Sequence, residues 1–535
     1  MSTTAHAKLE AENADLRAQI TAMQDALTTE RAEVAKERAE YERELRALAL
    51  EIAKFEEERR LDRARRFGAS SEAGDHQYRL FDEAESHAQS VDESADDNTQ
   101  DVPTTKPIKR RGKRQPLPAN LPRVVVTHEP ETTTCGCGHE MSVIGEKISE
   151  QLDVIPAQVY VIETHRPTLS CSRCDESIKT VPMPPQPIPK SIASPGLLAH
   201  VAVAKYSDGL PLYRQTKQFY RGGIDLPRNT LASHMLRTGE LLQPLVDAMH
   251  NHVLEYDVLQ MDETTVQVLK EPGKVAQSKS YMWVMKGGPP DQPAVLYDYA
   301  TSRSKDVPDR LLAGYAGHLQ TDGYAGYNKV LAREGITGLG CWAHARRKFV
   351  EAQKALPKAK QNKGTKVQQA LAWISKLYQI ERAIADKPPD ERSQRRQQDS
   401  AKVLQQFKVW LDKQSVPPQS LLGKAITYTL GQWPRLGIYL EDERLNIDNN
   451  GVENAIRPFA VGRKNWLFSD SQSGANASAN LYSVLETARA NELNDYAYLK
   501  LVLTELPKLK DASLNRLLPW NVTEEELRSQ LEPLR

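Results

Sequence analysis

The segments YDVLQMDETTVQVL (256–269), SYMWVMKG (280–287) and AVLYDYA (294–300) decide the fold. Each is short, rich in Val, Tyr, Thr or Met, and separated from the next by residues that favour turns. This pattern is typical of consecutive β-strands. We therefore expect three strands in succession at the start of one domain.

The segments that follow alternate between helix and strand. RSKDVPDRLLAGY (303–315) predicts a helix, and GHLQTDGYAGY (317–327) predicts a strand that ends in a turn. A short helix and then ITGLGCWAHARRKF (336–349) come next. The order of three strands, helix, strand, helix and strand fits a mixed α/β sheet.

The bulk properties set outer limits on the protein class. The chain has 535 residues, which is too long for one hydrophobic core and predicts roughly two to four domains. Lys plus Arg total 71 and Asp plus Glu total 71, so the net charge neither supports nor excludes a nucleic-acid partner. The start lacks the apolar core of a signal peptide, and no apolar run is long enough to span a bilayer. We expect a cytoplasmic protein without a membrane partner.

Residues 5–66 contain no Pro or Gly and are rich in Ala, Glu, Arg and Leu, which predicts one long helix. Such a helix with an apolar row of period seven is typical of a coiled coil and of a homo-oligomer. The row consists of Ile20, Leu27, Val34, Tyr41, Leu48 and Phe55. Glutamates at 30, 37 and 44 interrupt a second apolar row, so a single amphipathic helix lying on its own domain is the alternative.

Two charged segments follow the helix. Residues 82–101 hold eight acids and no Lys or Arg, whereas KPIKRRGKR (106–114) holds six bases. Segments of this composition are typical of disordered linkers. The basic half either contacts phosphates or only keeps the linker solvated.

Four of the five cysteines form two close pairs, in TTTCGCGHEM (132–141) and LSCSRCDE (169–176), between the β-type runs RVVVTHE (123–129) and AQVYVIETHRPTLS (157–170). Four thiolates close a tetrahedral Zn²⁺ site in a reducing compartment, and such a closed site is structural. The first pair is C-x-C, so His139 is an alternative ligand, and free thiols are the alternative to any metal. The expected ligands are Cys135, Cys137, Cys171 and Cys174.

The segment LPLYRQTKQFYRGGIDLPRNTLASHMLRTGELL (210–242) predicts two helices separated by a Gly-Gly break, as in a helix–turn–helix. The second helix is expected to begin near 227–229, with Asn229 or Thr230 as its cap. Arg228 and Asn229 would then stand at its exposed start, where a recognition helix meets base edges. A helix pair that binds nothing is the alternative.

Three acidic residues are candidate ligands of a catalytic metal ion. Asp262 interrupts an apolar strand, Asp322 ends the fourth strand, and Glu453 lies in NIDNNGVENAIRPFAVGRKNWLF (446–468), where a helix is expected to begin near 449–450. If the first and fourth strands are neighbours, Asp262 and Asp322 converge at one edge of the sheet, and Glu453 closes the site from a crossing helix.

Three such carboxylates suit Mg²⁺ or Mn²⁺, which prefer oxygen ligands. Two ions about 3.5–4 Å apart would support an in-line phosphoryl transfer. Alternation along the strand is expected to take the neighbouring acid Glu263 to the opposite face. Ordinary surface acids are the alternative to a site.

Basic residues gather around the same motifs and suit a surface that follows a DNA backbone, because phosphates attract them and bases stack on an aromatic ring. They are His344, Arg346, Arg347, Lys348, Arg457, Arg463 and Lys464, with the aromatic Trp466. A solvated helix face with Trp466 in the core is the alternative.

Long strings in the same order make the chain resemble the insertion sequence 66 family of transposases, of the TnpC type, over nearly its whole length. The strings are RRFGASSE (65–72), the CGCG and CSRC pairs, PIPKSIASPGLLAHVAVAKYSDGLPLYRQ (187–215), MDET (261–264), TDGYAGYN (321–328), GCWAHARRKF (340–349), IDNNGVENAIRPFAVGRKNWLFS (447–469) and RLLPWNV (516–522).

The resemblance implies an α/β ribonuclease-H-like catalytic core whose acidic DDE triad falls on Asp262, Asp322 and Glu453. It implies that His344, in a C-x-x-H signature with Cys341, supports the site or contacts DNA. The N-terminal modules are expected to read terminal inverted repeats in double-stranded DNA, and accessory proteins of the same element are expected partners.

The expected organisation combines these segments. It consists of a long helix or coiled coil (1–70), an acidic-then-basic linker (71–118), a small β-rich zinc-binding module (119–185), a helical DNA-binding region (190–250), a catalytic domain (255–485) with a helical insertion at about 352–432, and a C-terminal helical element (486–535).

The functional hypothesis is a bacterial-type DNA transposase. Water would cleave a phosphodiester at an element end, and the freed 3′-hydroxyl would attack target DNA at the same site. Two rival classes stay open. A regulator that binds inverted repeats would never cut DNA, and a ribonuclease-H-type nuclease would cut DNA without joining it.

Overall fold

The computed structural model describes residues 3–67, 125, 151, 159–170, 178–357, 364–509 and 511–532. The chain divides into two compact units, one made of Met1–Ser70 with Pro182–Arg535 and the other of Ser71–Val181.

The smaller unit contains one described hairpin. Strand β1 (Thr168–Ser170) pairs antiparallel with β2 (Ile178–Thr180), and the hydroxyls of Thr168 and Thr180 lie 2.9 Å apart. Residues 159–167 have no regular secondary structure, so the strand predicted over 157–170 is confirmed only at its end. The charged linker, His139 and all four paired cysteines lie outside the described residues.

The larger unit is built on a mixed sheet with the order β5-β4-β3-β6-β7. The first three strands form an antiparallel meander, and β6 and β7 continue from β3 in parallel. Their bounds are β3 (Val258–Lys270), β4 (Lys279–Gly287), β5 (Ala294–Ala300), β6 (Gly317–Gln320) and β7 (Ile336–Leu339). A short strand, β8 (Ser469–Ser471), pairs with the end of β3. The predicted order of strands is confirmed, and the first and fourth strands are neighbours.

Two helices cover this sheet. Helix α14 (Asn450–Trp466) packs against β3 and β4, and α15 (Gln472–Ala490) packs against β5. The Ser483 hydroxyl accepts the Tyr297 N–H at 2.8 Å, and the Thr487 hydroxyl donates to the Val295 carbonyl at 2.9 Å. These buried hydroxyls bind the open backbone of the edge strand β5, which explains polar residues in a buried helix.

Four helices lie directly before the sheet, as predicted for the helical segment 190–250: α3 (Pro195–Tyr206), α4 (Leu212–Arg221), α5 (Arg228–Leu241) and α6 (Gln243–Glu255). Helix α5 lies so close to α15 that a Cβ on Gly239 would come within 2.5 Å of Ala477. The cap of α5 is Pro227, which makes no side-chain hydrogen bond. The prediction that Asn229 or Thr230 caps this helix is therefore wrong.

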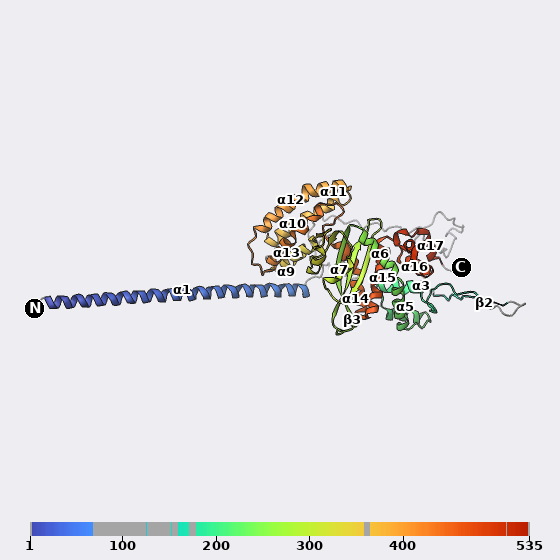
Figure 1. Cartoon of the computed structure of the whole chain (residues 1–535), viewed down its shortest axis with the longest axis horizontal. Coiled ribbons are helices and arrows are strands. Elements are labelled where there is room, and N and C mark those ends of the chain that lie inside the picture. The colour runs from blue at the N-terminus through green and yellow to red at the C-terminus, as the bar shows by residue number, and fades with distance from the viewer. Residues whose placement is uncertain are drawn as a thin grey trace, which may run out of the picture. The chain divides into compact units, whose positions relative to one another are not determined.

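A group of helices between β7 and α14 has its own core (Figure 1). They are α9 (Trp342–Ala355), α10 (Lys366–Ile384), α11 (Pro389–Arg395), α12 (Ala401–Asp412) and α13 (Leu421–Leu436). Trp342 and Phe407 are fully buried there, with ring centroids 6.1 Å apart, and Trp433 lies 5.8 Å from Trp342. We call α10–α13 the helical region.

The chain ends in helices α16 (Asp495–Glu505) and α17 (Glu524–Leu531), and α16 packs against α3. Two short helices, α7 (Asp306–Leu311) and α8 (Asn328–Leu331), flank β6 in the chain. A helical C-terminal segment therefore follows α15, as expected.

Helix α1 (Thr3–Phe67) confirms the predicted long helix (Figure 1). Its heptad side chains from Ile20 to Phe55 are exposed by 50–67 %. Near its end Leu61 is buried, and Arg60 Nε donates to the Ala355 carbonyl at 2.8 Å. The last turns of α1 thus pack on α9. Among the described residues, no helix is long and apolar enough to cross a membrane.

Candidate active site

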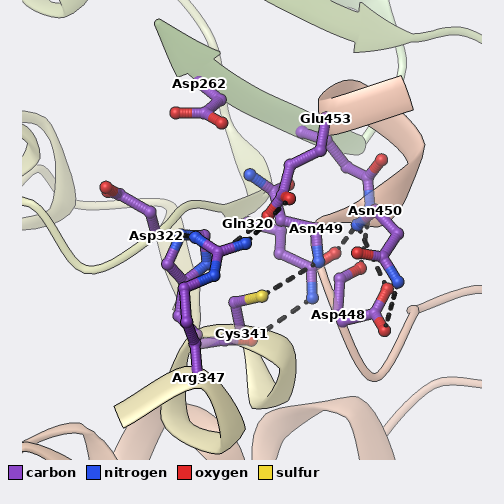
Figure 2. Close-up of polar contacts among 12 residues, drawn as sticks. Asp262, Gln320, Asp322, Cys341, Arg347, Asp448, Asn449, Asn450 and Glu453 are labelled. Atoms are coloured by element: carbon purple, nitrogen blue, oxygen red, sulfur yellow. Dashed lines mark hydrogen bonds and ion pairs between the residues drawn. The ribbon is translucent and has the colours of Figure 1, made fainter. Parts of the chain in front are cut away.

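The sheet brings two of the predicted acids together. Asp262 lies on β3, and Asp322 follows the end of β6, which pairs in parallel with β3 through Gln260 opposite Gln320. Carboxylate oxygens of Asp262, Glu263 and Asp322 lie within 4.8 Å of one another. The predicted convergence at one end of the sheet is confirmed (Figure 2).

The environment of the Asp262 carboxyl strongly disfavours its negatively charged form. Burial and the nearby carboxylates of Glu263, Asp322 and Glu453 raise its pKa to about 8. Only one of its contacts opposes this shift, the Glu263 N–H, which donates to Asp262 Oδ1 at 2.8 Å. Crowded acids of this kind are stabilised by a bound cation.

Glu263 departs from the expectation that strand alternation would take it away from the site. Its carboxylate accepts a hydrogen bond from the Tyr327 hydroxyl at 2.7 Å and one from Arg303 Nε at 2.5 Å. The Arg303 guanidinium also lies 3.7 Å from Asp322 Oδ2 and 3.7 Å from the centre of the Tyr324 ring. Glu263 therefore holds a half-exposed cation beside Asp322.

Neither Glu263 nor Arg303 was predicted as a site residue. Arg303 lies in the segment between β5 and α7, and its contact with Asp322 depends on the turn that follows β6. No local sequence pattern marks such a contact. The one usable signal was the pair of adjacent acids at 262–263, because a second buried acid needs a compensating cation.

Glu453 lies in the first turn of α14 and faces α9 (Figure 2). Arg347 Nη2 lies 3.3 Å from Glu453 Oε2, and His344 Nδ1 lies 3.5 Å from Glu453 Oε1. Arg347 Nη1 donates to His344 Nε2 at 3.1 Å, so the neutral ring carries its hydrogen on Nδ1, toward Glu453. Burial and Arg347 lower the pKa of His344, which agrees with a neutral ring. Glu453 Oε2 is thus held by Arg347 of α9, whereas Glu453 Oε1 only faces His344 Nδ1, without a hydrogen bond between them.

The third acid forms a group of its own. Ligand atoms of Glu453, His344 and Cys341 lie within 4.8 Å of one another, separately from the group around Asp262. Cys341 is buried, which raises its pKa to about 12, and its sulfur accepts the Asn449 N–H at 3.3 Å. Cys341 is therefore a neutral thiol that packs against the start of α14.

Other predicted basic residues take different places. Arg463 donates to Thr264 Oγ1 at 3.2 Å and to Thr265 Oγ1 at 3.1 Å, so it ties α14 to β3. Arg457 donates to Asn454 Oδ1 at 2.9 Å. Trp466 is half-buried, with its ring centroid 5.4 Å from that of Phe459, so it packs at the edge of the core. Arg347 and Lys348 are exposed on α9, Lys464 is exposed at the opposite end of α14 from Glu453, and Arg346 is half-buried.

The two helices predicted as a helix–turn–helix carry a basic surface. Arg228 and Asn229 are exposed at the start of α5. The exposed face of α4 adds Tyr213, Arg214, Lys217, Tyr220 and Arg221. A shallow hollow between the helices is lined by Lys217, Tyr220, Arg221 and Arg228, together with one acid, Asp225.

Comparisons with known proteins agree along most of the chain. A family model described as "Transposase IS66 family" matches residues 190–477, and one for the zinc-finger binding domain of transposase IS66 matches 132–175. Models described as "Transposase C of IS166 homeodomain" and "IS66 C-terminal element" match 54–126 and 483–520.

Two relatives come from Sinorhizobium fredii (strain NBRC 101917 / NGR234). The uncharacterized protein y4jD is 34 % identical over 423 residues, which cover 76 % of this chain and 81 % of the relative. The uncharacterized protein y4hP is 33 % identical over 428 residues, which cover 77 % of each chain.

Proposed function

Because the chain belongs to the IS66 family of transposases, we propose that it binds the terminal inverted repeats of an insertion sequence and catalyses metal-dependent DNA cleavage and strand transfer. We assign the catalysis to Asp262, Asp322 and Glu453. The observation that carries this assignment is the approach of the Asp262 and Asp322 carboxylates at one end of the sheet.

The donor set fits a divalent cation. Carboxylate oxygens are the ligands that Mg²⁺ and Mn²⁺ prefer. Burial and the neighbouring carboxylates raise the pKa of Asp262 to about 8, so a bound cation would stabilise its charged form. Asp262 and Asp322 would hold one side of the metal site, with Glu453 on the other. When bound, two divalent ions would activate the attacking hydroxyl and stabilise the leaving oxygen.

The protein's own side chains prepare the site for two phosphoryl transfers. In the first, water replaces the 3′-oxygen at the phosphorus of an element end, and that oxygen leaves as a 3′-hydroxyl. In the second, this hydroxyl attacks a phosphorus of target DNA and displaces another 3′-oxygen. Arg347 holds one oxygen of Glu453, His344 faces the other, and Arg303 supplies positive charge beside Asp322.

The topology supports a ribonuclease-H-like core. Three antiparallel strands followed by two parallel strands, in the order β5-β4-β3-β6-β7, place the first acid on the central strand and the second after its parallel neighbour. The helical region would then be an insertion between the second and third acids, at about 352–432.

The other modules would recruit DNA and assemble the complex. The basic face of α4 with Arg228 and Asn229 suits a phosphate backbone, and Lys348, Arg457 and Lys464 would extend contacts toward the site. Cys135, Cys137, Cys171 and Cys174 would hold a structural Zn²⁺. The exposed heptad row of α1 suits a coiled-coil homo-oligomer, accessory proteins of the element would join it, and the reaction would take place in the cytoplasm.

Strand transfer with pre-cut element ends tests the proposal. The wild-type protein with Mg²⁺ or Mn²⁺ is expected to join pre-cut ends and, in a parallel assay, to nick uncut ends. Asp262→Asn, Asp322→Asn and Glu453→Gln are expected to bind the ends without nicking or joining them. Asp412→Asn is a matched control, because Asp412 is exposed and pairs only locally with Lys408 on α12. A regulator would bind and never nick, and a nuclease would nick and never join.

A further inference from the structure

Hydrogen bonds join the turn that begins α14 to the sheet beside the site. Asn449 Nδ2 donates to the Met261 carbonyl at 3.1 Å, next to Asp262 in the chain. Gln260 Nε2 donates to the Asp448 carbonyl at 3.2 Å. These bonds are buried, and they fix the backbone one turn before Glu453, whose N–H donates to the Asn449 carbonyl at 3.1 Å.

The Asp448 side chain links the same turn to the helical region. The Asp448 carboxylate is 8 % exposed and accepts the Tyr378 hydroxyl of α10 at 2.8 Å. It also accepts the backbone N–H of Asn450 at 3.1 Å and the Asn450 side-chain amide at 2.8 Å (Figure 2). Three donors converge on one carboxylate, which suits a group that only accepts hydrogen bonds.

A second anchor from the helical region holds the segment before this turn. Arg396 is buried at the junction of α11 and α12, and its guanidinium is paired with Glu381 of α10 at 2.7 Å. It donates to the carbonyls of Tyr439, Asp442 and Leu445 at 2.9, 2.9 and 3.0 Å. The path from α13 to α14 is thus attached to the helical region at several points.

We propose that Tyr378 and Asp448 are positioning residues for Glu453, through which the helical region sets the place of the third carboxylate. The Tyr378 hydroxyl holds Asp448, Asp448 holds the first residues of α14, and α14 presents Glu453 to α9 and the metal site. This inference rests on the proposed function of Glu453. It assigns a positioning role to the helical region, which contributes no acid of its own to the site.

The test is Tyr378→Phe, which removes one hydroxyl and keeps the ring. We expect the dissociation constant for Mn²⁺, measured by calorimetry, and the half-activating Mn²⁺ concentration for joining of pre-cut ends each to rise about five-fold, as the loss of one hydrogen bond in a coupled site predicts. Asp448→Ala is expected to raise both at least as much. The double variant is expected to match Asp448→Ala alone, because both substitutions break one contact.

Tyr498→Phe is the matched control. The buried Tyr498 hydroxyl on α16 donates to the Leu517 carbonyl at 2.7 Å, so its loss removes a similar bond on an element that carries no proposed site residue. We expect a similar change in melting temperature to that of Tyr378→Phe and an unchanged Mn²⁺ requirement.

The inference is overturned if Tyr378→Phe and Tyr498→Phe need the same Mn²⁺ concentration, or if the effects of Tyr378→Phe and Asp448→Ala simply multiply. These results leave the proposed function standing as long as Asp262→Asn abolishes joining. If Asp262→Asn joins normally, the proposed function and this inference both fail.

Discussion

Asp262 and Asp322 bring their carboxylate oxygens within 4.8 Å of each other because β3 and β6 are parallel neighbours. Glu263 belongs to the same group, and Arg303 is the cation that faces it most closely.

The first prediction concerns pH. Burial and neighbouring acids raise the pKa of Asp262 from 3.8 to about 8, so the folded state binds a proton that the unfolded state releases. The contribution of Asp262 to the free energy of unfolding is therefore fully present below about pH 4. It falls by on the order of a few kcal/mol as pH rises from about 4 to 8. Without divalent ions, Asp262→Asn is expected to melt higher than wild type at pH 8 and equally at pH 4. A melting difference that is the same at both pH values contradicts this, and Asp412→Asn is the control.

The second prediction concerns the pairing of Glu263 with Arg303. The Glu263 side chain is 1 % exposed and the Arg303 side chain 36 % exposed. Arg303→Ala leaves a buried carboxylate without its cation and is expected to lower the free energy of unfolding by about 1–3 kcal/mol, after allowance for solvent. Adding Glu263→Gln should restore part of this loss in urea titrations. Additive losses in the double variant would show that the two residues do not compensate each other.

The third prediction concerns zinc. One Zn²⁺ per chain is expected by elemental analysis, and Cys171→Ser is expected to lose it together with binding to inverted-repeat DNA. Cys341→Ser is the matched control and should keep its zinc, because Cys341 is buried as a neutral thiol beside Asn449. If the Cys171→Ser protein still binds one Zn²⁺ per chain, the four assigned cysteine ligands are wrong.

The fourth prediction concerns the basic face of α4. Lys217 and Arg221 are exposed and line the hollow at the start of α5. Each change to Ala is expected to weaken binding to all duplexes alike and to reduce the slope of log K against log salt by about 0.9. Lys376→Ala, on the exposed face of α10, is the control. An unchanged slope would remove α4 from the DNA surface.

Much of the sheet could be predicted from local pattern. The strands around Asp262 and Asp322 have clear apolar runs and turn residues at their ends, and parallel pairing then brings these residues to one edge. The start of α14 just before Glu453 was also confirmed. These features depend on short-range chemistry, which a single sequence displays.

The missed features depend on contacts between distant segments. Alternation along β3 predicts that Glu263 points away from the site, yet Arg303 and Tyr327 hold its carboxylate beside Asp322. The bond from Tyr378 to Asp448 joins residues on separate elements and has no local sequence signal. Long-range pairs of this kind are set by tertiary packing, which periodicity and propensity do not describe.

The central claim is that Asp262, Asp322 and Glu453 carry out strand transfer. It is tested most directly by joining of pre-cut inverted-repeat ends to target DNA in Mn²⁺, with folding and end binding verified for every variant. We predict that Asp262→Asn, Asp322→Asn and Glu453→Gln each reduce joining by at least about a hundred-fold while Asp412→Asn joins normally. Joining at the wild-type rate by folded, DNA-bound Asp262→Asn would contradict the claim.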